Sequence, residues 1–162
     1  MPAPPLARAS SPSATEPESE VLAVVKALRA IVSAGIAARE YAAAVSDARA
    51  AVDRYLATSV SGPPPGGPEL RDAVHYYQMA EFAWRNHSVA SDTVWLRRDD
   101  ALDRCAGYRE FASEMQAKGE SHYSERTRSF VLISDRVLAV LWACAADRIL
   151  EAEQAFPREA KR

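Results

Sequence analysis

The sequence predicts an all-α fold, an antiparallel up-and-down bundle of long helices. Of the 162 residues, 48% are apolar but only 8% are aromatic, and alanine recurs throughout, which favours helices whose backbones approach closely. Apolar positions recur at steps of three and four, and no segment shows the alternation of a half-buried strand. Connections of modest length separate the helical stretches, so consecutive helices are expected to be antiparallel neighbours.

The chain is expected to form one domain with a tail at each end. Its length is enough to bury a core without a metal or a disulfide. Residues 2–17 carry five prolines together with Ser, Ala and Thr, a composition that buries too little apolar surface to order itself. We therefore expect a disordered tail over residues 1–17, a helical bundle over 18–157 and a short polar tail over 158–162.

The first helix is expected to be the longest. From Val21 to Tyr55 the apolar or small positions alternate steps of three and four, with one extra step of three near Ala38. Roughly 40 residues at about 1.5 Å each give a helix on the order of 60 Å long. Gly35 lies inside this stretch among alanines, so we interpret Ala34–Ala38 as a close helix crossing rather than a break.

The middle of the chain predicts one or two further helices. The segment SGPPPGGPE, residues 61–69, cannot continue a helix, and Pro68 suits the first turn of the next one. A polar, cap-like patch over residues 86–93 predicts a break or kink, and Lys118 followed by glycine predicts a helix end. The bundle therefore has four helices, or three if residues 69–118 are continuous.

The last helix is expected from about residue 125 to 156, where Pro157 stops it. Its middle, FVLISDRVLAVLWACAADRIL, is apolar almost all round, so this helix is expected to be the most buried. The uncharged run Val137–Ala146 is too short to cross a bilayer, which needs about 20 residues. No transmembrane segment is therefore predicted.

Charge and the start of the chain bear on partners and compartment. The formal charge of −2 comes from 20 basic and 22 acidic residues spread along the chain, which excludes nucleic acid as a predicted partner. The start lacks the apolar segment of a signal peptide, yet Ala7–Ala9 before Ser10 resembles a small-residue cleavage site. We expect a periplasmic or otherwise exported protein, with a cytoplasmic location as the alternative.

Cys105 and Cys144 each lie on an apolar stripe, where a small buried thiol is the favoured interpretation. Export would allow them to pair. A turn centred near residue 122, however, places Cys105 opposite residue 139, about 7.5 Å along the axis from Cys144. The spacing therefore favours unpaired thiols, with a disulfide as the alternative.

No metal, cofactor or catalytic residue is predicted. A di-iron bundle site needs Glu-x-x-His on two helices, and the motif does not occur. His75 and Met79 share one helix face, so they cannot supply opposite ligands to one haem. Asp99 and Asp100 are a pair of carboxylates among arginines, where a solvated charged face is expected. The sequence therefore favours a non-enzymatic function over an enzymatic one.

The stretch HYYQMAEFAWRNH, residues 75–87, concentrates aromatic side chains on one side of a helix. Successive residues turn by 100°, which gathers Gln78, Glu81 and Arg85 on the water side and leaves an apolar arc of about 160° opposite. A pocket on this arc would hold a small molecule or haem, with an acid of the last helix as its polar anchor. The candidate ligand-binding residues are Tyr76, Tyr77, Trp84, His87, Asp135 and Trp142.

Two functions follow from these patterns. The favoured one is a non-enzymatic interaction or scaffold protein that acts through protein–protein contacts, with a protein partner or a second copy of itself. The long first helix and the patch Ala34–Ala38 support it, because small residues permit close packing. The alternative is a small-molecule or haem-binding helical bundle with an aromatic-lined pocket.

Overall fold

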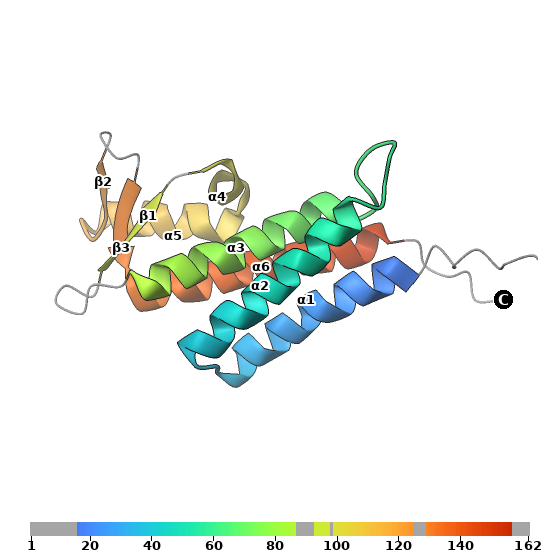
Figure 1. Ribbon diagram of the computed structural model, residues 1–162. Coiled ribbons are helices and arrows are strands. Elements are labelled where there is room, and N and C mark those ends of the chain that lie inside the picture. Colours follow the sequence, from blue (N-terminus) through green and yellow to red (C-terminus); the bar gives the residue numbers. More distant parts are fainter. Residues whose placement is uncertain (1–15, 87–92, 98, 125–128, 157–162) are drawn as a thin grey trace, which may run out of the picture.

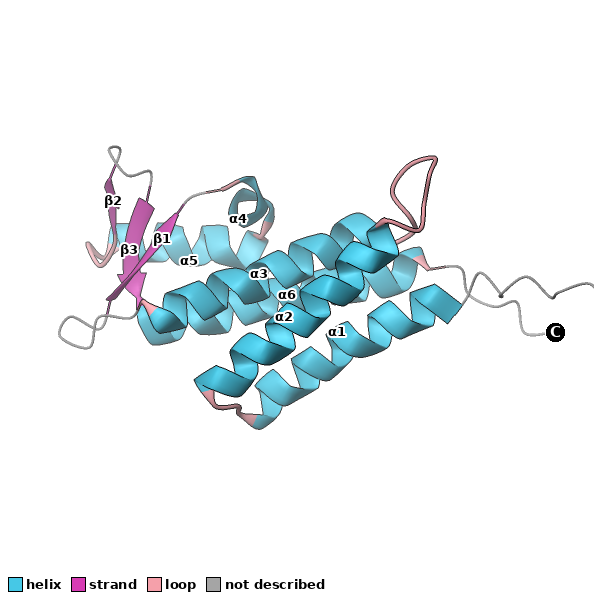
Figure 2. Cartoon of the chain, viewed as in Figure 1, coloured by secondary structure: helices cyan, strands magenta, loops and turns pink. Residues whose placement is uncertain are grey.

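The computed structural model describes residues 16–86, 93–97, 99–124 and 129–156. Within these ranges the chain forms six helices and three short strands, so the all-α class is confirmed (Figures 1 and 2). The elements are α1 (Glu16–Ala34), α2 (Ala38–Leu56), α3 (Gly67–Arg85), β1 (Thr93–Arg97), α4 (Asp100–Arg104), α5 (Ala106–Ala117), β2 (His122–Ser124), β3 (Ser129–Ile133) and α6 (Ser134–Ala155). Except for residues 16 and 17, which belong to α1, the two expected tails lie outside the described residues.

Four long helices form the body of the molecule. Helix α2 packs on α3, α3 packs on α6, and α1 contacts both α2 and α6, which closes a ring of four. A salt bridge between Lys26 and Glu153 joins α1 to α6. Figure 1 shows α4 and α5 beside the α3–α6 pair, and α5 packs on α6. Among the described residues, no helix is long and apolar enough to cross a bilayer.

The prediction of one long first helix is wrong, because the chain turns after Ala34. Gly35 has a φ of +83°, and its N–H donates to the carbonyl of Val32 at 3.2 Å. Glycine takes this left-handed conformation without steric cost and commonly ends helices. Helices α1 and α2 therefore form a hairpin of two 19-residue helices. The patch Ala34–Ala38 is its turn rather than a crossing point.

The predictions at the two ends of the middle segment are confirmed. Pro68 lies in the first turn of α3, after Gly66 in a left-handed conformation. Helix α3 ends at Arg85, where the expected break begins, and residues 87–92 lie outside the described part. Helix α5 ends before Gly119, whose N–H donates to the carbonyl of Gln116, while Glu120 N–H donates to Met115. This pair of bonds is a Schellman motif.

A small antiparallel sheet replaces helix at two places, so the prediction of no strands is wrong. The strand order is β1-β3-β2, with Trp95 opposite Val131 and Tyr123 opposite Phe130. The segment SFVLI of β3 is rich in aromatic and β-branched residues, which suit a strand. A short apolar run cannot be assigned by periodicity alone. Helix α6 therefore begins at Ser134 rather than near residue 125.

The core lies where α3 faces α2 and α6. Helix α3 buries nine of its 19 residues, whereas α6 buries six among those described. The expectation that the last helix is the most buried is therefore wrong. The reason is that α3 packs between two long helices while one side of α6 stays open to solvent.

Candidate functional site

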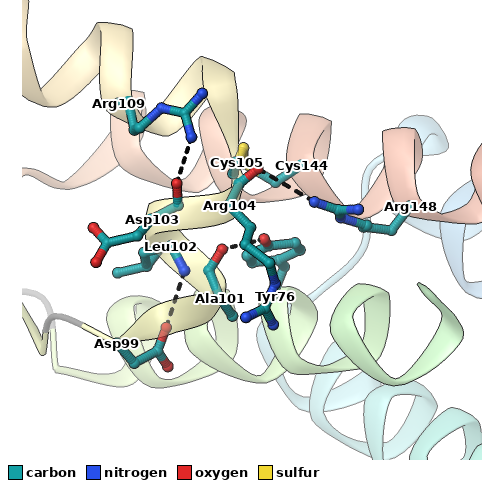
Figure 3. The surroundings of a disulfide bond; sticks show 10 residues. All are labelled: Tyr76, Asp99, Ala101, Leu102, Asp103, Arg104, Cys105, Arg109, Cys144 and Arg148. Atoms are coloured by element: carbon teal, nitrogen blue, oxygen red, sulfur yellow. Dashed lines mark hydrogen bonds between the residues drawn. A yellow bond between two sulfur atoms is a disulfide. The ribbon is translucent and has the colours of Figure 1, made fainter. Parts of the chain in front are cut away.

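The predicted aromatic residues are divided between two places in the core. Tyr76 and Tyr77 are fully buried. The Tyr76 hydroxyl donates to the carbonyl of Ala101, so this side chain points toward α4 (Figure 3). Trp84 and Trp142 are half-buried and lie together, with ring centroids 6.1 Å apart.

Tyr41 is the centre of this aromatic cluster, although it was not among the predicted residues. Its ring lies 5.6 Å from that of Trp84 and 6.1 Å from that of Trp142. Its hydroxyl donates to the carbonyl of Tyr77 at 2.8 Å and accepts from Trp142 Nε1 at 3.1 Å. Burial raises the pKa of the Tyr41 and Tyr77 hydroxyls, that of Tyr77 to about 12. The rings therefore pack on one another as parts of the core.

The remaining two predicted site residues are not described at the level of side chains. His87 lies outside the described residues, and Asp135 lies in the first turn of α6 with its side chain outside the described part. The structure thus brings together Trp84 and Trp142 from the predicted set. Tyr76 is turned away from them, toward α4.

A cleft of about 520 Å³ lies between α2, α3 and α4. Small aliphatic residues from all three elements border it, and each is buried: Val52, Val74 and Ala101. Polar and charged side chains form the rest of its lining. They are Arg49, Asp53, Arg71, Asp72, His75, Gln78, Asp99, Asp100 and Arg104.

Asp99 joins α3 to α4 through both of its carboxylate oxygens. Oδ1 accepts from the N–H of Leu102 at 3.0 Å, which makes Asp99 the N-cap of α4. Oδ2 lies 2.5 Å from His75 Nε2, in a hydrogen bond to α3. His75 is therefore hydrogen-bonded to the N-cap residue of α4.

Arg104 makes the second link between α4 and α3. Its Nη2 donates to Asp72 Oδ1 at 2.9 Å and its Nε donates to Asp72 Oδ2 at 3.1 Å. The carboxylate of Asp72 raises the pKa of the guanidinium. Asp100 lies four residues before Arg104 on the same helix, but the Arg104 side chain reaches across to α3. A wider salt bridge of 3.6 Å joins Arg49 and Asp53 on α2.

A disulfide between Cys105 and Cys144 holds the end of α4 against α6 (Figure 3). The Cα atoms are 5.7 Å apart, so the expectation of unpaired thiols is wrong. Cys105 has extended backbone angles between α4 and α5, and two strands intervene before α6. The chain between the two cysteines is therefore not one helix–turn–helix, and a turn at residue 122 does not set which residues of α6 lie opposite Cys105. A continuous helical hairpin was the wrong basis for the register.

No family model, no curated protein and no solved structure matches this chain. Among the described residues, no three His, Cys, Asp or Glu side chains form a group that would hold a metal ion. The geometry of the cleft therefore carries the functional argument.

Proposed function

We propose that this protein works by binding another molecule in the cleft between α2, α3 and α4, without a chemical step. The cleft volume of about 520 Å³ is the observation that carries the proposal. Sites for small molecules typically enclose about 300–1,000 Å³. Asp99 and Asp72 support a binding role, because their carboxylates hold α4 against α3.

Both functions expected from the sequence are binding functions, and the structure favours the small-molecule one. The long helix and the small-residue crossing that supported a protein partner do not form. Of the aromatic residues offered for a pocket, Trp84 and Trp142 pack on each other, and Tyr76 points toward α4. The small-molecule proposal therefore moves from the aromatic arc to the charged cleft.

A thermal-shift screen with a panel of polar metabolites tests this proposal. We expect at least one compound to raise the Tm of the wild-type protein, because a ligand of the folded state stabilises it. Arg71→Ala removes a cleft side chain, and Arg39→Ala removes an exposed arginine near the start of α2, outside the cleft. The compound should act on Arg39→Ala but not on Arg71→Ala. Equal shifts in all three proteins, or no shift with any compound, would contradict the proposal.

A protein partner is the second candidate, and exposed apolar side chains at the strand end of the bundle favour it. Phe82 on α3 and Trp95 on β1 are each 49% exposed, and α3 packs on β1. Strand β1 is also an edge strand of the sheet, and such edges present unpaired backbone groups. Light scattering at several protein concentrations, with Trp95→Ala alongside, tests for a homo-oligomer. A monomer at every concentration would exclude self-association.

We further propose that the protein is exported, since disulfides persist in oxidising compartments. The buried bond between Cys105 and Cys144 supports this location. Fractionation of cells that express the full-length gene, followed by alkylation of free thiols, tests it. Protein recovered from the cytoplasm with both thiols reactive would contradict it.

A further inference from the structure

Two charged side chains of the cleft have no ion pair among the described residues, Arg71 on α3 and Asp100 on α4. The other charged groups are engaged with each other. The pairs are Arg49 with Asp53, His75 with Asp99, and Arg104 with Asp72. One positive and one negative group are therefore available to a ligand in the same hollow.

These two groups lie beside different contacts between α3 and α4. Helix α4 runs antiparallel along α3, because Arg104 meets Asp72 while Asp99 meets His75 three residues later. Three residues correspond to about 4.5 Å along a helix axis. Arg71 precedes Asp72 and so lies at the Arg104 end, and Asp100 follows Asp99 at the other end. Figure 3 shows Asp99 and Arg104 at the two ends of α4.

A second hollow of about 280 Å³ adjoins the cleft at the end near Arg71. Its charged lining residues are Glu69, Arg71, Asp72, Arg104 and Arg148. Arg148 Nη2 donates to the carbonyl of Arg104 at 3.2 Å, and its Nη1 pairs with Glu151 at 2.5 Å. Arg71 is the guanidinium without a described acid partner. Its planar N–H groups fit a carboxylate in a bidentate way.

The apolar part of the lining lies on the same three elements as the two charges. Val52, Val74 and Ala101 are small, aliphatic and between 2% and 6% exposed. An aliphatic ligand side chain placed against them would be removed from water, which favours binding. The cleft thus combines a cation, an anion and a small aliphatic surface.

We propose that the cleft binds a small zwitterion, namely a free amino acid with an aliphatic side chain. Its carboxylate pairs with Arg71, its ammonium pairs with Asp100, and its side chain packs on Val52 and Val74. This inference rests on the proposed function, because it names the class of ligand for the same cleft. A few ångströms separate the charges of an amino acid, and the Asp72 and His75 contacts, beside which Arg71 and Asp100 lie, are about 4.5 Å apart along α3.

Isothermal titration with three matched compounds tests the inference on the full-length, oxidised protein. L-valine is a zwitterion, N-acetyl-L-valine carries only the negative charge and L-valinamide carries only the positive one. We expect L-valine to bind at least tenfold more tightly than either analogue. Arg71→Ala should weaken L-valine at least tenfold while leaving L-valinamide unchanged, and Asp100→Asn should weaken L-valine but not N-acetyl-L-valine.

Two exposed residues of α2 outside the cleft serve as matched controls, Arg39→Ala and Glu40→Gln. Both should bind L-valine as the wild type does. Circular dichroism establishes that each variant is folded before titration. If a single-charge analogue binds with the same affinity as L-valine, the zwitterion proposal is overturned while the cleft remains a binding site. If L-valine does not bind but the metabolite panel yields another ligand, the zwitterion proposal is likewise overturned and the cleft remains a binding site. If neither experiment finds a ligand, the proposed function is overturned too.

Discussion

The disulfide between Cys105 and Cys144 should contribute several kcal/mol to the free energy of unfolding. The two residues are 39 positions apart, and the chain-entropy relation for a loop of that length gives about 4 kcal/mol at 25 °C. The domain from Glu16 to Ala155 has an unfolding entropy of about 0.3 kcal/mol per kelvin at the usual value per residue. Loss of the bond should therefore lower Tm by roughly 10–15 °C.

Single and double cysteine variants separate the bond from the packing of the sulfur atoms. Cys105→Ala and Cys144→Ala each remove the whole cross-link, so each should lose nearly as much stability as the double variant. Independent side chains would give additive losses instead. Urea unfolding followed by circular dichroism measures all three variants beside the oxidised protein. Wild-type protein reduced before unfolding is the control that keeps both sulfur atoms.

Two results would refute this reasoning. In the first, the double variant loses as much free energy of unfolding as the two single variants together, and the reduced wild type unfolds like the oxidised one. The other is the reaction of two thiols with an alkylating reagent in denatured protein that was never reduced. Either result means that Cys105 and Cys144 are buried side chains without a bond between them.

Three further perturbations test other parts of the fold. Gly35→Ala should lower the free energy of unfolding by about 1–2 kcal/mol, because φ is +83°; a Cβ there meets no neighbour within 4 Å, so the cost comes from the backbone alone. Gly107→Ala inside α5 is the control and should cost nothing. Urea midpoints of the two variants measure the difference. Asp99→Ala should cost about 1 kcal/mol through the lost N-cap, while Asp99→Asn keeps a capping oxygen and should retain most of that stability. Burial raises the pKa of Tyr77 from 10 to about 12, so the free energy of unfolding should hold below pH 10 and fall as pH rises through 12. Tyrosinate absorbance at high pH, measured together with circular dichroism, tests this. Ionisation of Tyr77 near pH 10 in folded protein would contradict it.

Local chemistry in the sequence was sufficient to place several helix ends. Pro68 and Gly119 act through their own backbone conformations, and both lie where the sequence placed them. Gly35 could have been recognised in the same way. The extra step of three near Ala38 marks the point where the apolar stripe begins again in α2.

The strands and the cleft depend on contacts that no short stretch of sequence specifies. Apolar runs such as SFVLI suit a buried helix or a strand equally well until a partner strand is known. The links of Asp99 to His75 and of Arg104 to Asp72 join residues 24 and 32 positions apart. Asp99 did offer one local signal, since an aspartate before Asp100–Arg104 is a common N-cap, and that signal would have placed α4 correctly.

The disulfide and the cleft belong to one structural unit, because Cys105 directly follows Arg104. Besides the hydrogen bonds from Tyr76 and Arg148 to its carbonyls, α4 has three long-range links: the bond to α6, the contact with His75 and the contact with Asp72. The two polar links lie at half-exposed positions, where an ion pair contributes only about 0–1 kcal/mol. The covalent link is therefore the strongest of the three, and it fixes the element that carries Asp100. A ligand that bridges α3 and α4 depends on this geometry, so loss of the disulfide should weaken binding in the cleft even where the rest of the bundle stays folded.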